Sequence, residues 1–234
     1  MRNILQKIRN GVQRHGALNS VRTFALKALE SLFALKVLRG VHVERPDESF
    51  LGVPDRYTGG FLASNELRAY ACDPDTELSD RFLDGAFARG DECYALRDGK
   101  DLAAYGWYSF GSTPIGLPGL VLNFSPEYVY MYKGFTDMRH RGKRLHAIGM
   151  TRALEHYVSR GRKGVVSYVE ATNLDSLKSC FRMGYSVFGS VYALRVFGRH
   201  YAVSSPGCKR FDFRLNRPTS RATLPSARRT APAR

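Results

Sequence analysis

The fold is decided by a strand–turn–helix pattern in residues 128–160, which read YVYMYKGFTDMRHRGKRLHAIGMTRALEHYVSR. Residues 128–135 are rich in Tyr, Val and Phe, as strands are, and residues 145–160 have the spacing of a helix. The turn between them is centred on Gly142, a residue type that tolerates positive φ and lets a ligand approach the backbone closely. A helix that begins directly after such a turn offers free N–H groups and the positive end of its dipole, which together bind phosphate.

Cations surround this turn on both sides of the glycine. They are Arg139, Arg141, Lys143 and Arg144. Four positive charges at a helix start predict a polyanion ligand, and a pyrophosphate fits best. The alternative is a solvated charge cluster at the start of an ordinary helix, because basic turns are common.

The formal net charge of +15 is concentrated at the two ends of the chain. Residues 1–40 and residues 209–234 each carry eight Lys/Arg and a single acid, whereas residues 41–208 carry 20 basic and 19 acidic residues. The middle is therefore close to neutral, which argues against a broad nucleic-acid-binding face, and no specific nucleic-acid partner is expected. The chain divides into a basic amphipathic helical extension (1–40), one folded domain (41–208) and a basic tail (209–234), disordered from about Arg217.

The N-terminal extension has apolar residues at helical spacing from residue 4 to residue 38, with basic residues interleaved. Gly16 interrupts this helix and Gly40 ends it, and a short strand is expected from Val41. A basic amphipathic helix lies on an anionic membrane surface or packs on its own domain, and the sequence leaves both open. An Arg-rich start is also typical of mitochondrial transit peptides. We expect a cytoplasmic protein, peripheral on the inner face of the membrane.

The cysteines are scattered through the chain without a Cys-x-x-Cys pair, at Cys72, Cys93, Cys180 and Cys208. This spacing argues against a structural zinc site or a disulfide framework, and no metal is expected. Between the ends, strand and helix patterns alternate. Helices are expected from residues 64 and 76, a hairpin turn at Asp98-Gly99, a strand over 165–170 and a last pair of strands over 185–203.

The order of these elements and two motifs resemble the GNAT superfamily of acyl-CoA N-acyltransferases over residues 41–203. Residues 139–145 are similar to the family's pyrophosphate loop, Arg/Gln-x-x-Gly-x-Gly/Ala, and residues 173–185 to its later motif, an Asn, a small residue three on and a Gly-aromatic pair. The sequence looks like the branch found with bacterial envelope or exopolysaccharide biosynthesis. The resemblance implies an α/β (α+β) fold, with a central, mostly antiparallel twisted sheet flanked by helices. Arg144 departs from it at the second Gly/Ala position, and Cys180 where many members have a tyrosine.

The resemblance implies acetyl-CoA as acyl-donor cosubstrate and a primary amine as acceptor. The residues expected to bind acetyl-CoA are Gly134, Phe135, Thr136, Arg139, His140, Arg141, Gly142, Lys143, Arg144, Leu145, Asn173 and Ser176. An oxyanion donor is expected from a backbone N–H near residues 134–135. Cys180, with an ordinary thiol pKa of about 8.5, is expected to protonate the departing thiolate or to be a small buried apolar residue.

The attacking amine also needs a base. Candidates are Glu127, Glu170, Tyr130 and Tyr132. Glu127 ranks first, because it begins the central strand beside the expected acceptor cleft. The sequence thus predicts an N-acetyltransferase that acts by direct transfer in a ternary complex, on an amino sugar or a lipid- or sugar-linked envelope precursor. The alternative is a catalytically inactive binding module of the same fold, tethered at a membrane surface.

Overall fold

The computed structural model describes residues 16–33, 35–196 and 199–218. The first part of the expected N-terminal helix (4–15) and most of the expected disordered tail (219–234) lie outside the described residues.

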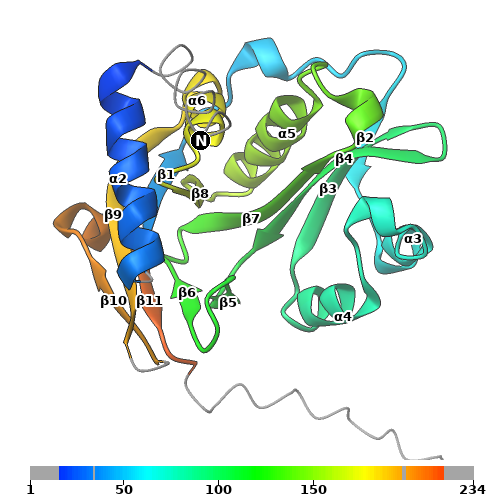
Figure 1. Cartoon of the computed structure of the whole chain (residues 1–234). Coiled ribbons are helices and arrows are strands. Elements are labelled where there is room, and N and C mark those ends of the chain that lie inside the picture. Colours follow the sequence, from blue (N-terminus) through cyan, green and yellow to red (C-terminus); the bar gives the residue numbers. More distant parts are fainter. Residues whose placement is uncertain (1–15, 34, 197–198, 219–234) are drawn as a thin grey trace, which may run out of the picture.

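An eight-stranded sheet forms the centre of the molecule, with strand order β10-β9-β1-β8-β7-β4-β3-β2 (Figure 1). Its strands are β1 (Leu35–Val43), β2 (Thr58–Phe61), β3 (Glu92–Asp98), β4 (Asp101–Ser109), β7 (Tyr128–Thr136), β8 (Gly164–Glu170), β9 (Ser186–Val196) and β10 (Arg199–Ser204). Neighbouring strands are antiparallel except β7 and β8, which are parallel. A three-stranded sheet adds β5 (Thr113–Pro114), β6 (Val121–Asn123) and β11 (Arg214–Asn216). The expected mixed fold with a mostly antiparallel sheet is confirmed.

Helices cover both faces of the large sheet (Figure 1). They are α2 (Ala17–Phe33), α3 (Ser64–Tyr70), α4 (Asp80–Ala88), α5 (Leu145–Ser159) and α6 (Leu174–Arg182). Because strand side chains alternate between faces, Tyr94 and Leu96 of β3 belong to the core under α5 and α6, whereas Cys93 and Ala95 belong to the core under α3 and α4. Within the described part of the chain, none of the helices combines the length and the apolar character that crossing a membrane requires.

The parallel strands β7 and β8 pair only over their first residues. Their pairing runs from Tyr128–Gly164 to Tyr130–Val166. At the next residue pair the Ser167 hydroxyl donates to the Met131 carbonyl at 2.7 Å. A side-chain hydrogen bond therefore takes the place of the backbone hydrogen bonds between the two strands. Beyond this point β7 pairs with β4 alone, and among the described residues no strand pairs with its other edge; the space between β7 and β8 past this point is here called the opening.

The N-terminal region differs from the prediction. Helix is expected through Leu38 and a strand from Val41, but α2 ends at Phe33 and β1 already begins at Leu35. Strand β1 lies between β8 and β9 and pairs with both of them. Hydrogen-bonded neighbours on two sides and alternating burial stabilise this strand over the helical pattern of the isolated sequence.

The expected domain boundaries at 40/41 and 208/209 both fall inside elements of the folded part. The first lies within β1, and the second within the 3-10 helix η4 (Pro206–Phe211). The side chains of Phe211, Phe213 and Leu215 are buried in the core between the two sheets. Residues 209–216 of the expected tail therefore belong to the folded structure.

Candidate functional site

The turn before α5 has an unusual backbone. Strand β7 ends at Thr136, the 3-10 helix η3 (Met138–His140) follows, and α5 begins at Leu145. Gly142 has φ +79°, and Arg144, the N-cap residue of α5, has φ +60°. Glycine adopts this left-handed conformation freely, whereas an L-residue such as arginine holds it at a cost of roughly 1–2 kcal/mol. Position 144 therefore has a conformation that glycine would adopt without this cost.

The first turn of α5 faces this loop with free donors. The Ile148 N–H donates to the Arg144 carbonyl at 3.0 Å. The N–H groups of Leu145, His146 and Ala147 precede this bond and have no acceptor within the helix. The loop residues from Arg141 to Arg144 are exposed. An anion can therefore reach the helix terminus.

Two of the loop residues predicted to bind acetyl-CoA are engaged in holding the loop. Arg139 forms ion pairs with Asp137 at 2.9 Å and Asp101 at 3.4 Å, and hydrogen bonds from Arg139 lower the pKa of Asp137 to about 2. His140 is buried, and its Nδ1 lies 3.1 Å from the hydroxyl of Tyr57. The positive charge that remains for a ligand comes mainly from residues nearer the helix start, Arg141, Lys143 and Arg144.

The remaining predicted residues of β7 lie on both of its faces. Gly134 lies under α5, where a Cβ would meet the imidazole of His146 and the end of the Met131 side chain, so a larger residue would require these side chains to move. Burial lowers the pKa of His146, which keeps the ring neutral. Phe135 points to the opposite face and stacks on Tyr105, with ring centroids 5.1 Å apart. Thr136 pairs with Ala104 at the end of the strand.

The second motif forms the start of α6 and has a local structural role. Asn173 is the N-cap residue, and its side-chain oxygen accepts a hydrogen bond from the Ser176 N–H at 3.1 Å. Cys180 is buried in the same core as Leu177 and Tyr185. Burial raises the pKa of Cys180 to about 11, above the ordinary thiol value of about 8.5.

Glu127 lies at the end of β7 that is farthest from the loop. The strand rises about 3.3 Å per residue, so roughly 30 Å separates Glu127 from Thr136. Its carboxylate forms an ion pair with Lys163 at 2.6 Å, beside the point where β7 and β8 are still paired. The expectation that Glu127 stands beside the opening is therefore wrong. Glu170 is likewise engaged, in an ion pair with Lys36 at 3.2 Å.

A cavity of about 610 Å³ lies on the α4 face of β7, opposite α5. Its lining comes from α4, the loop at 114–116, β7 and β8. The residues are Ser79, Arg81, Phe82, Gly85, Arg89, Pro114, Ile115, Gly116, Tyr130, Tyr132, Lys133 and Tyr168. The size and the aromatic lining with a few polar groups suit a small organic molecule.

A bulge in β7 shapes this cavity. Trp107 of β4 pairs with Lys133 and Tyr108 pairs with Met131, so Tyr132 is an extra residue. Tyr132 and Lys133 consequently both approach α4: their ring and ammonium group lie 6.2 Å and 5.4 Å from the ring centroid of Phe82. Consecutive residues of a regular strand would point to opposite faces.

Tyr132 belongs to a buried polar cluster at the wall of the cavity. Its hydroxyl donates to Asp91 Oδ2 at 2.9 Å, and Arg89 donates to the same oxygen at 2.7 Å. The Asp91 side chain is fully buried, and among the described residues its Oδ1 has no hydrogen-bond partner. Burial and the neighbouring Asp91 carboxylate raise the pKa of Tyr132, so its hydroxyl is protonated at neutral pH.

The sequence names Tyr132 among the base candidates but does not identify Asp91. The one sequence signal is positional: Asp91 follows Gly90, which lies two residues beyond the end of α4 and has φ +75°. Nothing in the sequence reports that β7 is bulged. Within the described residues, no group of three or more His, Cys, Asp or Glu is placed to hold a metal ion.

The sequence matches no protein-family model and no curated protein. Similar solved structures include a GCN5-related N-acetyltransferase-like protein from Streptococcus suis (12% identity, TM-score 0.47, covering 73% of this chain and 67% of that chain). A GCN5-related N-acetyltransferase from Sphaerobacter thermophilus has 11% identity and a TM-score of 0.47, covering 83% and 56%. A ribosomal-protein-alanine N-acetyltransferase from Brucella melitensis biovar Abortus has 14% identity and a TM-score of 0.40, covering 54% and 89%.

These proteins carry names from the family that the two sequence motifs resemble. The chain spans about two thirds or less of the length of the first two. Likenesses of this size carry no argument about the reaction, so the function rests on the residues of this chain.

Proposed function

We propose that the chain is an acyl-CoA-dependent N-acyltransferase that moves an acetyl group from acetyl-CoA to a primary amine in a ternary complex. The proposal rests on the position of β7, which contributes to two sites. Its end leads into the anion-binding loop before α5, and its bulged middle forms the floor of a cavity on the other face. Strands β7 and β8 pair only from Tyr128 to Tyr130, and in this proposal the donor and the acceptor meet beyond that point.

The donor binds at the α5 side in this proposal. The pyrophosphate occupies the terminus of α5, held by backbone N–H groups and by the exposed cations Lys143 and Arg144. The thioester arm extends toward the opening between β7 and β8. A backbone N–H on the free edge of β7, near Gly134 and Phe135, donates to the thioester oxygen as negative charge develops on it.

The amine enters from the cavity on the α4 side. Its nitrogen forms a bond to the thioester carbon, and the carbon–sulfur bond then breaks. The proton that the amine loses passes to the Tyr132 hydroxyl oxygen while the Tyr132 proton moves to Asp91, which is the final acceptor. The departing thiolate takes the proton of the Cys180 thiol, which is present at neutral pH because the pKa of Cys180 is raised to about 11, and Cys180 then regains a proton from solvent while Asp91 releases its proton to solvent.

The acceptor class follows from the cavity lining. Aromatic rings at Phe82, Tyr130 and Tyr168 favour a ring-shaped or carbohydrate acceptor, since sugar and aromatic faces stack on such rings. An amino sugar, free or carried by a larger envelope precursor, combines such a ring with a primary amine. The phenol groups also offer hydrogen bonds to sugar hydroxyls.

The test is acetyl-CoA consumption by the purified chain against amino sugars, amino acids and aromatic amines, with release of free thiol as the readout. We expect thiol release with at least one amino sugar, and saturable heat when acetyl-CoA is titrated by calorimetry. No heat of binding would contradict the donor site.

The second candidate is an inactive module that binds the donor without turnover, and it is favoured by Arg144 and Cys180, where the chain departs from the family pattern. Heat of acetyl-CoA binding together with no thiol release from any amine would support this candidate instead.

A further inference from the structure

The exposed large apolar side chains of this protein gather on one side of the molecule, away from both the donor loop and the α4 cavity. Ten such side chains are exposed among the described residues, and Met138 alone lies elsewhere. The other nine come from α2, α6, β9 and β10. They are Leu18, Val21, Phe181, Val187, Tyr192, Leu194, Val196, Tyr201 and Val203, here named the apolar face.

The strand register places the sheet residues of this face on a single surface. In antiparallel strands, paired residues point to the same side. Tyr192 pairs with Val203 and with Val37, while Leu194 pairs with Tyr201. These side chains therefore stand on the face of the sheet that β1 turns toward α2 and α6.

Helix α2 covers only part of that surface. It packs on β1, where Val37 is buried, and it leaves Val203 and Tyr201 of β10 uncovered at 70% and 53% exposure. On its outer side α2 presents Leu18 and Val21, three residues apart and so on one helical stripe. The helix thus packs on its own domain and also extends the apolar face outward.

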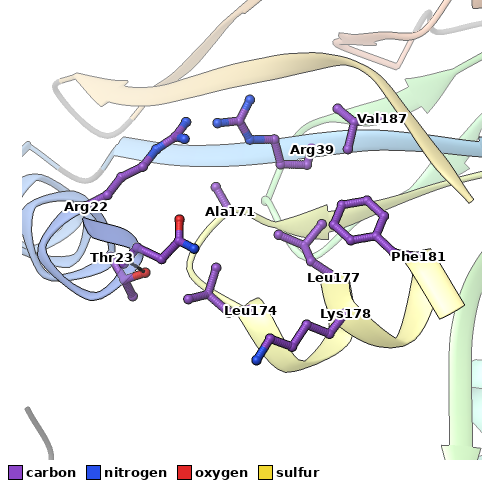
Figure 2. A pocket seen from close by; sticks show the side chains of 10 residues that line it. Arg22, Thr23, Arg39, Ala171, Leu174, Leu177, Lys178, Phe181 and Val187 are labelled. Atoms are coloured by element: carbon purple, nitrogen blue, oxygen red, sulfur yellow. Dashed lines mark hydrogen bonds between the residues drawn. The ribbon is translucent and has the colours of Figure 1, made fainter. Parts of the chain in front are cut away.

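Cations accompany the apolar face. A pocket of about 340 Å³ lies where α2, α6, β1 and β9 meet. Figure 2 shows Leu174, Leu177 and Phe181 along one side of it, and the guanidinium groups of Arg22 and Arg39 on the other. Lys178 lines the same pocket, and Arg199 pairs with Val196 on the strand surface, so that four cations lie within the face.

We propose that this face docks on an anionic phospholipid surface. Apolar side chains accompanied by Arg and Lys match a bilayer interface, where the side chains enter the acyl boundary and the cations meet lipid phosphates. The pocket between Arg22 and Arg39 provides a place for one headgroup phosphate beside an apolar floor. This inference goes beyond the acyl transfer reaction and does not depend on it.

A second copy of the chain fits this face less well. A self-complementary contact would bring the same four cations of two copies against each other. Such like-charge contact is unfavourable, whereas an anionic bilayer neutralises the charges. Contiguous exposed apolar surface of this kind is rare on monomers that have no interaction partner.

The experiment is cosedimentation of the full chain with vesicles of phosphatidylcholine alone or with one third phosphatidylglycerol. We expect binding to the anionic vesicles only, weakened by salt. The variant Val203→Gln/Tyr201→Gln removes apolar contact, and Arg22→Gln/Arg199→Gln removes charge, with a loss of roughly fivefold in affinity for each charge. Met138→Gln and Lys100→Gln are the matched controls and should bind like the original chain, because neither residue is on the apolar face.

Unfolding midpoints of all variants establish that each one is folded. Vesicle binding that is unchanged in both double variants would overturn the proposal and assign any binding to the basic ends of the chain. Sedimentation of the protein without lipid measures its oligomeric state and is a second test. If the original chain is a dimer and Val203→Gln/Tyr201→Gln is a monomer, the proposal is overturned in favour of a second copy. If the original chain and the variant are both monomers, the proposal is supported.

Discussion

At the scale of single residues, the loop before α5 depends on Gly142. Its φ of +79° strains any branched side chain, and the pyrophosphate must approach the backbone at this point. We expect Gly142→Val to lose most of its affinity for acetyl-CoA, measured by calorimetry, and some stability. Gly161→Val is the matched control, because Gly161 has φ +85° at the other end of α5 with equally open space around it. If both variants bind acetyl-CoA equally well, the loop is not the donor site.

Tyr132 tests the proton path. Removing a general base or its relay typically lowers turnover by ~10²–10⁴-fold, so Tyr132→Phe and Asp91→Asn should each lower kcat by at least roughly 10² with little change in the KM for acetyl-CoA. Tyr168→Phe removes a phenol from the same cavity without touching Asp91, and it should change the KM for the amine more than kcat. Equal kcat values for Tyr132→Phe and Tyr168→Phe would remove Tyr132 from the mechanism.

The Cys180 thiol should resist alkylation at neutral pH, because alkylation requires the thiolate. Burial disfavours the thiolate and raises the pKa of Cys180 to about 11, so about one molecule in a thousand is ionised at pH 8. We expect iodoacetamide to label exposed Cys72 at pH 8 and Cys180 only as the pH approaches 11, as read by peptide mass spectrometry. Labelling of Cys180 as rapid as that of Cys72 at pH 8 would show an accessible thiolate instead.

The residues that the sequence could predict are those with a local signature. Gly142 in a basic turn and Asn173 before an apolar helix face are local patterns, and both lie where the patterns predict. The Asp91–Tyr132 pair could not be predicted, because 41 residues separate the partners and only the bulge in β7 brings them together. The prediction for Glu127 was wrong for a different reason, because strand position alone does not tell at which end β7 and β8 separate.

At the scale of the elements, α6 tests what the second motif does. The side chain of Asn173 caps the helix, and replacing such a cap with alanine costs about 1 kcal/mol. We therefore expect Asn173→Ala to lower the free energy of unfolding by that amount in urea. Asn173→Asp keeps an acceptor oxygen for the Ser176 N–H and loses only the amide donor. If capping is the role of Asn173, this variant should keep both the stability and the affinity for acetyl-CoA. A stable Asn173→Asp variant with weakened donor binding would instead mean that the amide contacts the donor.

The elements themselves were largely predictable from periodicity and turn chemistry. The Asp98-Gly99 hairpin and helix α5 lie where the sequence places them, with Gly99 at φ +61°. Strand β1 was not predictable, since apolar residues at helical spacing continue through Leu38. Its conformation is set by β8 and β9, which are more than 120 residues away in the chain.

At the scale of the whole molecule, β1 joins the N-terminal segment to the sheet. The strand fills the place between β8 and β9, so without it the outer strands β9 and β10 lose their hydrogen-bonded connection to β8. Leu38, Val41 and Val43 also leave both cores when it is removed. The unit that folds therefore begins before β1, at about residue 34, and not at residue 41.

Two truncations decide this point. A chain of residues 34–234 keeps β1 and should unfold cooperatively in urea, with a midpoint lowered only by the loss of the α2 contacts. A chain of residues 41–234 loses most of β1 and should be insoluble or unfold without a cooperative transition. It lacks the buried side chains of Val37 and Leu38, which cost about 2–5 kcal/mol each against a total stability of about 5–15 kcal/mol, and most of the backbone pairing of β1 with β8 and β9. A matched control is residues 1–218, which lacks only the chain after the last described residue and should unfold like the full chain. Cooperative unfolding of residues 41–234 at the midpoint of residues 34–234 would mean that β8 and β9 can close the sheet without β1.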